Sequence, residues 1–152
     1  MQPDWNTDMH TIVLTRLFNA TAAQVWAAWT DPAILPKWFG PTGFFCTTKD
    51  IDLRSGGQWV FDMTGPDGKV WPNRHRITRY TPMTRIEFLL DDGSDDGDPM
   101  EVVVDLTPEA GGIRLVQTLY MPSAEAKAGA LAFGADKLGE TTLDKLAAIL
   151  AD

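Results

Sequence analysis

Apolar positions near the N-terminus follow first a strand pattern and then a helical one. Residues 9–17, MHTIVLTRL, are rich in β-branched and apolar side chains and predict a strand. Thr21 with Gln24 three positions later has the sequence of a capping box and predicts the start of a helix. Asp31-Pro32 is expected to end that helix and to begin a second short one, which stops near residues 38–41.

The middle of the chain changes to a period of two, which is typical of strands. Trp59, Phe61 and Met63 alternate on one face of residues 58–64. Pro72-Asn73 interrupts a longer strand and predicts a bulge or an edge position there. With turn sequences rich in Gly and Pro between them, the predicted strands cover residues 44–53, 58–64, 69–80, 85–90, 101–106 and 113–121.

Helical spacing returns in the last part of the chain. Apolar and small residues recur there at intervals of three and four: Leu131, Ala135, Leu138, Thr142, Leu146 and Ile149. This spacing predicts one long helix over residues 124–150, with Ser123 as its N-cap. Gly129, Gly134 and Gly139 each cost about 1 kcal/mol relative to Ala inside a helix. They either admit close packing or a ligand, or they mark an irregular first half.

The order of the elements predicts an α+β domain over residues 9–152, behind a loose lead-in of residues 1–8. A curved antiparallel sheet of about six to seven strands would wrap around the C-terminal helix, and the two short helices after the first strand would close one end. One helix cannot fill the concave side of such a sheet. A deep apolar hollow is therefore expected between them, and hollows of this kind are the usual small-molecule sites.

Composition narrows the class of function. The 152 residues are 44% hydrophobic and 22% charged, which is enough apolar matter for one packed core. The net charge of −8 repels phosphate backbones and anionic lipid surfaces, so neither nucleic acid nor a membrane is expected as a partner. The N-terminus has no signal-peptide pattern and Cys46 is the lone cysteine. We expect a cytoplasmic location and no disulfide, metal or other cofactor.

Several short motifs, in a fixed order, resemble one known family. They are Phe18-Asn19-Ala20, Val25-Trp26, Trp29-Thr30-Asp31-Pro32, Trp38-Phe39-Gly40-Pro41, residues 52–57 (DLRSGG), residues 65–68 (GPDG), Pro72-Asn73-Arg74, Pro82 with Arg85-Ile86, and residues 142–146 (TLDKL). Together they resemble the homologues of the activator of Hsp90 ATPase, a branch of the START-like, or polyketide-cyclase-like, superfamily. The resemblance implies a helix-grip fold with an interior cavity, and apolar ligands are the common assumption for single-domain members. Eukaryotic members stimulate the ATPase of the Hsp90 chaperone.

Two places depart from the pattern of that family. Leu138-Gly139 stands where the last helix usually has Gly-Trp, so a bulky ring is missing and the cavity would move or enlarge. Residues 75–79, HRITR, stand where the family often has Gly-Val-Tyr-x-Glu, so a base replaces an acid.

Aromatic side chains are the main candidates for lining the cavity. The chain has six tryptophans, and rings on a concave sheet face can stack on or enclose an apolar ligand. Plain core packing is the alternative, and it is the expected role of Trp26 and Trp29. The predicted ligand cavity comprises Trp38, Phe39, Trp59, Phe61, Met63, Trp71, His75, Ile77, Phe88, Tyr120, Phe133 and Leu138.

His75 lies between two arginines on a predicted strand. It can act as an acid or base, form a hydrogen bond to a ligand, or be an ordinary core or surface histidine. Either the odd-numbered residues of 75–79 point inward or the even-numbered ones of 74–80 do, and the sequence leaves both open. An inward arginine needs a counterion such as Glu87 or a ligand carboxylate, so the arginines are expected to point outward.

Two weaker signals favour unremarkable roles. Cys46 has neither basic neighbours nor a helix start beside it, so it is expected to be buried and unreactive. The acidic residues 92–97 imitate the start of a calcium-binding loop, but Val103 stands where the bidentate Glu is required. This segment is expected to be a solvated hairpin loop.

The sequence therefore predicts a module that binds a small hydrophobic or amphipathic molecule between the sheet and the C-terminal helix. The first alternative is an interaction protein that regulates an Hsp90-type chaperone. The second is a cyclase- or hydrolase-like enzyme that uses the same cavity, although the chain has no recognisable catalytic set of residues. A homodimer is compatible with the fold.

Overall fold

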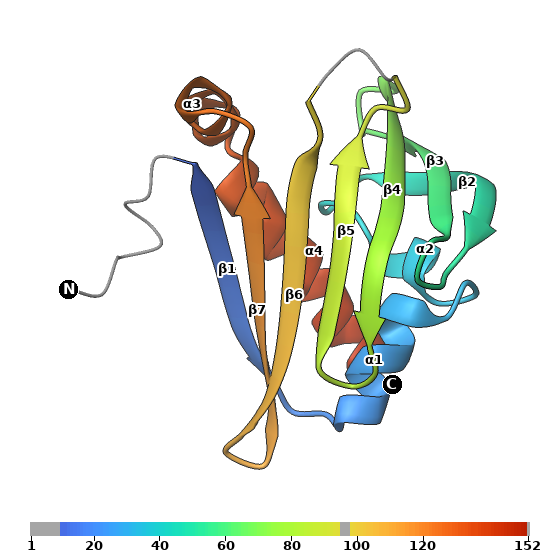
Figure 1. Ribbon diagram of the computed structural model, residues 1–152, viewed down its shortest axis with the longest axis vertical. Coiled ribbons are helices and arrows are strands. Elements are labelled where there is room, and N and C mark those ends of the chain that lie inside the picture. Colours follow the sequence, from blue (N-terminus) through green and yellow to red (C-terminus); the bar gives the residue numbers. More distant parts are fainter. Residues whose placement is uncertain (1–9, 95–97, 152) are drawn as a thin grey trace.

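The computed structural model describes residues 10–94 and 98–151, and the predicted lead-in lies outside them. One antiparallel sheet of seven strands dominates the described part of the chain (Figure 1). Its spatial order is β1-β7-β6-β5-β4-β3-β2. The strands are β1 (Thr11–Phe18), β2 (Phe45–Asp52), β3 (Gln58–Thr64), β4 (Val70–Thr81), β5 (Arg85–Asp91), β6 (Met100–Glu109) and β7 (Gly112–Tyr120). The predicted strands are all present, close to their predicted bounds.

Two short helices follow β1, as predicted: α1 (Ala22–Thr30) and α2 (Leu35–Trp38). The capping box is confirmed, because the Gln24 backbone N–H donates to Thr21 Oγ1 at 3.1 Å and the Thr21 N–H donates to Gln24 Oε1 at 2.8 Å. The predicted start of the second helix at Pro32 is wrong. Asp31 instead accepts a hydrogen bond from the Ala33 N–H at 2.8 Å, which closes a turn ahead of α2.

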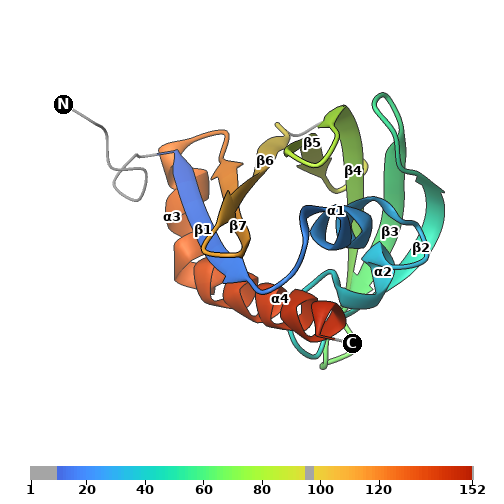
Figure 2. The same ribbon diagram turned by 90° about the horizontal axis from the view of Figure 1, so that it is seen from below.

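The prediction of a single C-terminal helix is also wrong, because the segment forms two helices, α3 (Ala124–Phe133) and α4 (Ala135–Leu150). Ser123 caps α3 as predicted, accepting from the Ala126 N–H at 3.0 Å. Gly134 ends α3 with a φ of +91°, a left-handed conformation that glycine adopts without a Cβ clash. The two helices therefore run in different directions (Figures 1 and 2).

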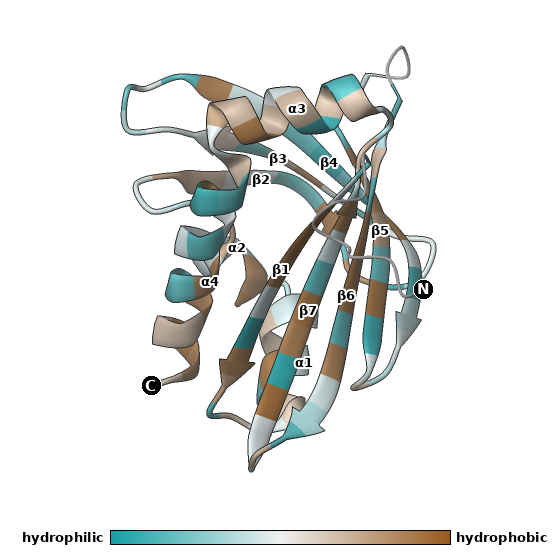
Figure 3. Cartoon of the chain, turned by 90° about the vertical axis from the view of Figure 1, so that its left-hand side faces the viewer, coloured by the Kyte–Doolittle hydropathy of each residue, from teal (hydrophilic) through white to brown (hydrophobic). Residues whose placement is uncertain are grey.

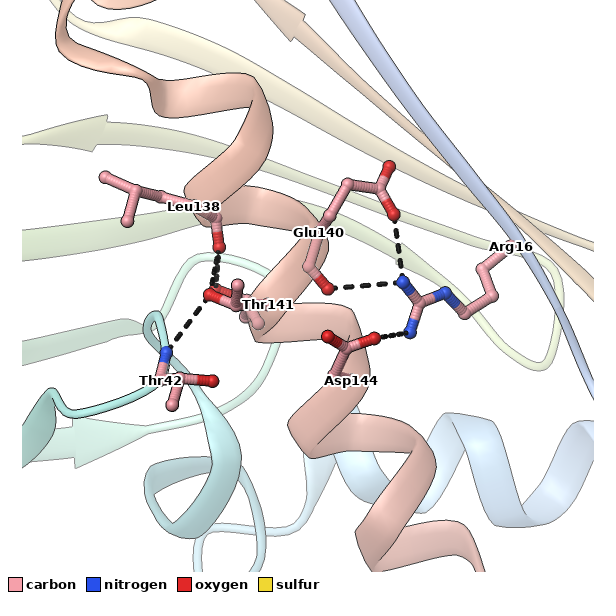
Figure 4. Close-up of polar contacts among 7 residues, drawn as sticks. Arg16, Thr42, Leu138, Glu140, Thr141 and Asp144 are labelled. Atoms are coloured by element: carbon pink, nitrogen blue, oxygen red, sulfur yellow. Dashed lines mark hydrogen bonds and ion pairs between the residues drawn. The ribbon is translucent and has the colours of Figure 1, made fainter.

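The helix α4 crosses the concave side of the sheet and is held there on two sides (Figures 2 and 4). The Arg16 guanidinium of β1 lies 2.6 Å from Asp144 Oδ1 and 2.9 Å from Glu140 Oε2. On the other side, the Thr42 backbone N–H donates to Thr141 Oγ1 at 3.1 Å. No helix in the described ranges is long and apolar enough to cross a bilayer.

The three glycines of the C-terminal helical segment have different structural roles. A Cβ on Gly139 would lie 2.5 Å from Leu14 Cδ1, so this glycine admits the close packing of α4 on β1. Gly134 is the irregularity that separates the two helices. No atom of the described residues lies within 4 Å of a Cβ built on Gly129, so packing among them does not require glycine there. Of the two explanations that the sequence left open, close packing applies to Gly139 and an irregularity of the helix applies to Gly134.

A register shift between Ile77 and Arg79 decides which residues of β4 point inward. Before the shift, His75 and Ile77 are buried against the helices. After it, Tyr80 turns to the same side and packs edge-on against Trp26, with ring centroids 5.4 Å apart. Neither of the two alternatives for this strand holds along its whole length, because a bulge exchanges the two faces of a strand.

The bulge expected at Pro72-Asn73 is therefore found elsewhere, at residue 78. Pro72 pairs in register with Asp62 of β3. The pairing of β4 with β5 starts only at Arg74, so Pro72 has a strand neighbour on one side, as the edge alternative requires. Hydrophobic and hydrophilic bands follow one another along β7 in Figure 3, as expected of a sheet with one buried face. By contrast, β1 and β6 contain runs of three hydrophobic residues, Ile12-Val13-Leu14 and Val102-Val103-Val104.

Candidate functional site

An aromatic cluster fills the part of the interior that lies under β3 and α2. The Phe39 ring is at its centre, edge-on to Trp59 at 5.5 Å and to His75 at 4.9 Å between centroids. Trp59 and Phe61 stack on each other at 3.7 Å, and Trp38 is fully buried beside them. These side chains pack mainly on one another, and the Trp38 Nε1–H donates to the Ala28 carbonyl at 2.8 Å.

A cavity of about 130 Å³ lies between the sheet and α4. We call it the α4-side cavity. Its walls come from β1, β5, β6, β7 and α4, together with Phe39: Leu14, Phe39, Phe88, Leu90, Met100, Val102, Gln117, Leu119, Ala135, Gly139 and Thr142. Gln117 and Thr142 are the only polar members of this set. Of the residues predicted to line a cavity, Phe39 and Phe88 do so here.

A second, much smaller cavity of about 10 Å³ lies beside His75, and we call it the His75 cavity. It is lined by Trp29, Leu35, Leu53, His75, Ile77, Tyr80, Ile86 and Phe88. His75, Ile77 and Phe88 were among the predicted lining residues. Of the residues that the structure describes, Phe88 alone lines both cavities.

His75 is surrounded by aromatic rings. Its ring stacks on Phe88 with centroids 4.4 Å apart and lies edge-on to Trp59 and Phe61 at 5.2 Å each. Only 4% of its surface is exposed, and burial lowers its pKa from 6.5 to about 3, although the Asp91 carboxylate acts in the opposite direction. At neutral pH the imidazole is therefore uncharged.

Two residues that line the His75 cavity each carry a buried nitrogen atom with no hydrogen-bond partner in the described part of the chain: Nε2 of His75 and Nε1 of Trp29. Trp29 is 3% exposed. Most buried polar side-chain atoms in folded proteins are paired, so two unpaired ones on the same cavity are unusual.

The neighbouring arginines lie on the outer face of β4, as expected. The Arg74 Nε and NH2 groups donate to the two carboxylate oxygens of Asp91 at 2.9 and 2.8 Å. Arg76 Nη2 also donates to Asp91 Oδ2, at 2.9 Å. The hydrogen bond from Arg74 is the main reason that the pKa of Asp91 is lowered. The inward arginine that would have needed Glu87 or a ligand carboxylate is therefore not found here; Asp91, which the sequence did not suggest, pairs with both arginines on the outer face.

Among the described residues, neither cavity is lined by the other predicted residues, which include Trp38, Trp59 and Phe61 of the aromatic cluster. Trp71 and Phe133 are 37% and 65% exposed and meet edge-on at 6.2 Å, with Lys69 Nζ 3.9 Å from the centre of the Trp71 ring. Half-buried positions are occupied by Met63, Tyr120 and Leu138, and none of them is in the lining of either cavity.

Sequence reasoning missed all of the walls that β6, β7 and α4 contribute to the α4-side cavity. The alternation that exposes Glu101 and buries Val102 was available as a signal, and so was the unusual Gly139 inside a helix. The sequence could not show that Gln117 and Thr142, two polar residues on different elements, line the same cavity.

The thiol of Cys46 is half-buried and donates to the Phe39 carbonyl at 3.3 Å. Burial raises its pKa to about 11, and the charge of Lys145 opposes this only in part. The thiol is thus protonated at neutral pH. It is less buried than expected, and Lys145 is a basic neighbour that the local sequence did not indicate.

The acidic loop considered for calcium lies partly outside the described residues, because residues 95–97 are not among them. Within the ranges that are described, the acidic, histidine and cysteine side chains form no group of three or more that could hold a metal ion.

Comparisons with known proteins agree with this architecture. The chain matches the family model described as activator of Hsp90 ATPase homolog 1-like protein over residues 19–151. Protein Ms6760 from Mycobacterium smegmatis is similar in structure, with 30% sequence identity, a TM-score of 0.85, and coverage of 99% of this chain and 95% of that one. A protein from Rhodobacter sphaeroides is 28% identical, with a TM-score of 0.83 and coverage of 95% and 94%. No protein of curated function matches the sequence.

The seven-stranded sheet with α4 on its concave side defines a helix-grip α+β protein of the START-like class. A protein from Arthrobacter aurescens, 23% identical with a TM-score of 0.86 and coverage of 97% and 90%, shares this fold. The chain belongs to the activator of Hsp90 ATPase homolog 1-like family.

Proposed function

We propose that this protein binds a small, largely apolar molecule in the α4-side cavity. The observation that supports the proposal most strongly is the cavity itself: about 130 Å³ bounded by five elements of the fold, with mostly apolar walls. Concave, apolar sites with a few polar groups are the usual form of small-molecule sites. The family is compatible with this role, because its fold surrounds an interior space with a sheet and a helix.

The size of the cavity limits the ligand. An apolar cavity of roughly 150 Å³ holds a benzene molecule, so the α4-side cavity suits a molecule with about one ring. A lipid with two acyl chains needs several times this space. A single-ring aromatic or a short branched aliphatic molecule is therefore the ligand class that we propose.

Titration with para-butyltoluene, followed by amide NMR shifts or calorimetry, tests this function. We expect saturable binding and shifts confined to residues around the α4-side cavity. Ala135→Leu places a larger side chain in the wall and should weaken binding at least tenfold, since the added atoms compete for the same volume. Ala132→Leu is the matched control, because Ala132 is exposed on α3. An absence of saturable binding, or equal weakening in both variants, would contradict the proposal.

Regulation of an Hsp90-type chaperone is a second candidate, supported by the description of the family model. The test is an ATPase assay of a purified Hsp90-type chaperone with and without this protein, together with a pull-down. Stimulation that persists in Ala135→Leu would assign the activity to a surface, whereas loss in that variant would connect it to the cavity. Unchanged ATPase activity and no retention in the pull-down would exclude this candidate. The cyclase- or hydrolase-type alternative and the homodimer stay predictions from the sequence.

A further inference from the structure

The unpaired nitrogen atoms of Trp29 and His75, two residues that line the same cavity, point to a ligand group that is not part of the protein. Trp29 Nε1–H can only donate a hydrogen bond, whereas His75 Nε2 of a neutral imidazole either accepts or donates according to the tautomer. A hydroxyl group offers both a donor and acceptor lone pairs, so it can pair with Trp29 and with either tautomer of His75.

The volume of the His75 cavity agrees with one such group. About 10 Å³ is close to the minimum that holds a single oxygen atom with its hydrogens. A carboxylate or a phosphate group, with two or more oxygen atoms, exceeds this volume.

Charge also restricts the ligand. The walls of both cavities carry no Asp, Glu, Lys or Arg among the described residues. Arg74 and Arg76 are on the outer face of β4 and are engaged by Asp91. An ionised ligand group in the interior would have no counterion, and burying an unpaired charge is strongly unfavourable.

The two cavities lie in sequence along the inner face of β5. Ile86 lines the His75 cavity, Leu90 lines the α4-side cavity, and Phe88 between them lines both. Resting on the function proposed above, we propose that the His75 cavity is the polar end of one continuous ligand site. It takes the hydroxyl group of an uncharged alcohol or phenol whose apolar body occupies the α4-side cavity, with the Phe88 ring turned aside.

The test compares para-butylphenol with para-butyltoluene, which differ only by a hydroxyl in place of a methyl group. In the wild-type protein, we expect a preference for the phenol that falls about tenfold in Trp29→Phe and in His75→Phe, since each variant removes one hydrogen-bonding nitrogen and keeps a ring. Trp26→Phe is the matched control, because Trp26 lines neither cavity, and it should retain the preference. The phenol should also move the indole N–H resonance of Trp29, assigned by its loss in Trp29→Phe.

Each outcome decides between the two proposals. Binding of both probes with no change of preference in the Trp29 and His75 variants would overturn the hydroxyl site and leave the proposed function standing. Binding of neither probe would overturn both. If the indole resonance of Trp29 does not move in wild-type protein saturated with the phenol, the hydroxyl lies elsewhere and this inference is wrong, whatever the stability of the variants. Binding of para-butylbenzoate as tight as that of the phenol would contradict the exclusion of charge.

Discussion

The two ends of the interior face the same sheet, but they are filled in different ways. Under β3, the rings of Trp38, Trp59 and Phe61 are fully buried and leave little room. Between β6, β7 and α4 the walls are mostly aliphatic, and a space of about 130 Å³ remains. The rings of Trp59 and Phe61 on β3 meet the Phe39 ring next to α2, at 5.5 and 6.0 Å between centroids, whereas the shorter side chains of Val102 and Leu119 border empty space. Aromatic density in a sequence of this kind therefore indicates the packed end of the interior, and shorter side chains mark the open end.

The largest effect that we expect separates these two ends by stability. Trp59→Ala removes a fully buried ring with close neighbours and should lower the free energy of unfolding by about 3–5 kcal/mol. Leu90→Ala removes a half-buried side chain that already borders empty space, so about 2 kcal/mol is expected. Urea denaturation of the two variants measures the difference. Equal losses would show that the two ends are packed alike.

Burial of His75 at the packed end of the interior should also make the stability of the protein depend on pH. The pKa of His75 is about 3 in the folded protein and about 6.5 when unfolded, so the unfolded chain binds the extra proton between these values. Stability therefore falls as the pH drops below 6.5, by up to about 1.4 kcal/mol per pH unit from this group. Denaturation midpoints between pH 7 and pH 4.5, compared with those of His75→Phe, measure the slope. A variant with the wild-type slope would contradict the assignment to His75.

The open end depends on how closely α4 approaches β1. Gly139→Ala gains about 1 kcal/mol of helix propensity but places a Cβ 2.5 Å from Leu14, so a net loss of about 1 kcal/mol is expected. Gly129→Ala is the control: it gains the same propensity and meets nothing within 4 Å, so it should stabilise the protein. Thermal unfolding distinguishes the two, and a stabilised Gly139 variant would show that α4 can move away from β1 at little cost.

The smallest effect is expected outside both ends. Phe133 is largely exposed, and its main ring contact is the edge of Trp71 at 6.2 Å. Phe133→Ala should change the free energy of unfolding by at most about 1 kcal/mol, because little apolar surface is re-exposed. It should leave the binding of para-butyltoluene unchanged, since Phe133 lines neither cavity. Weaker binding in this variant would connect α3 to the ligand site.

Features that depend on neighbouring residues could be predicted from the sequence. The capping box of Thr21 and Gln24, the N-cap at Ser123 and the shared face of Trp59 and Phe61 all rest on interactions within a few residues. The order of strands and helices, and with it the α+β helix-grip class, follows from the same local patterns. These predictions succeed because backbone period and capping are local properties.

Other features depend on packing between distant segments, and only the folded structure showed them. The bulge at residue 78 brings both His75 and Tyr80 inward, although strand periodicity offers one face or the other. Gly134 ends one helix, whereas Gly139 lets α4 pack closely on Leu14 of β1, although both are glycines in the same helical sequence pattern. Where interior space remains is decided by the lengths of side chains that meet from β1, β5, β6, β7 and α4, because a void is a property of all its walls together.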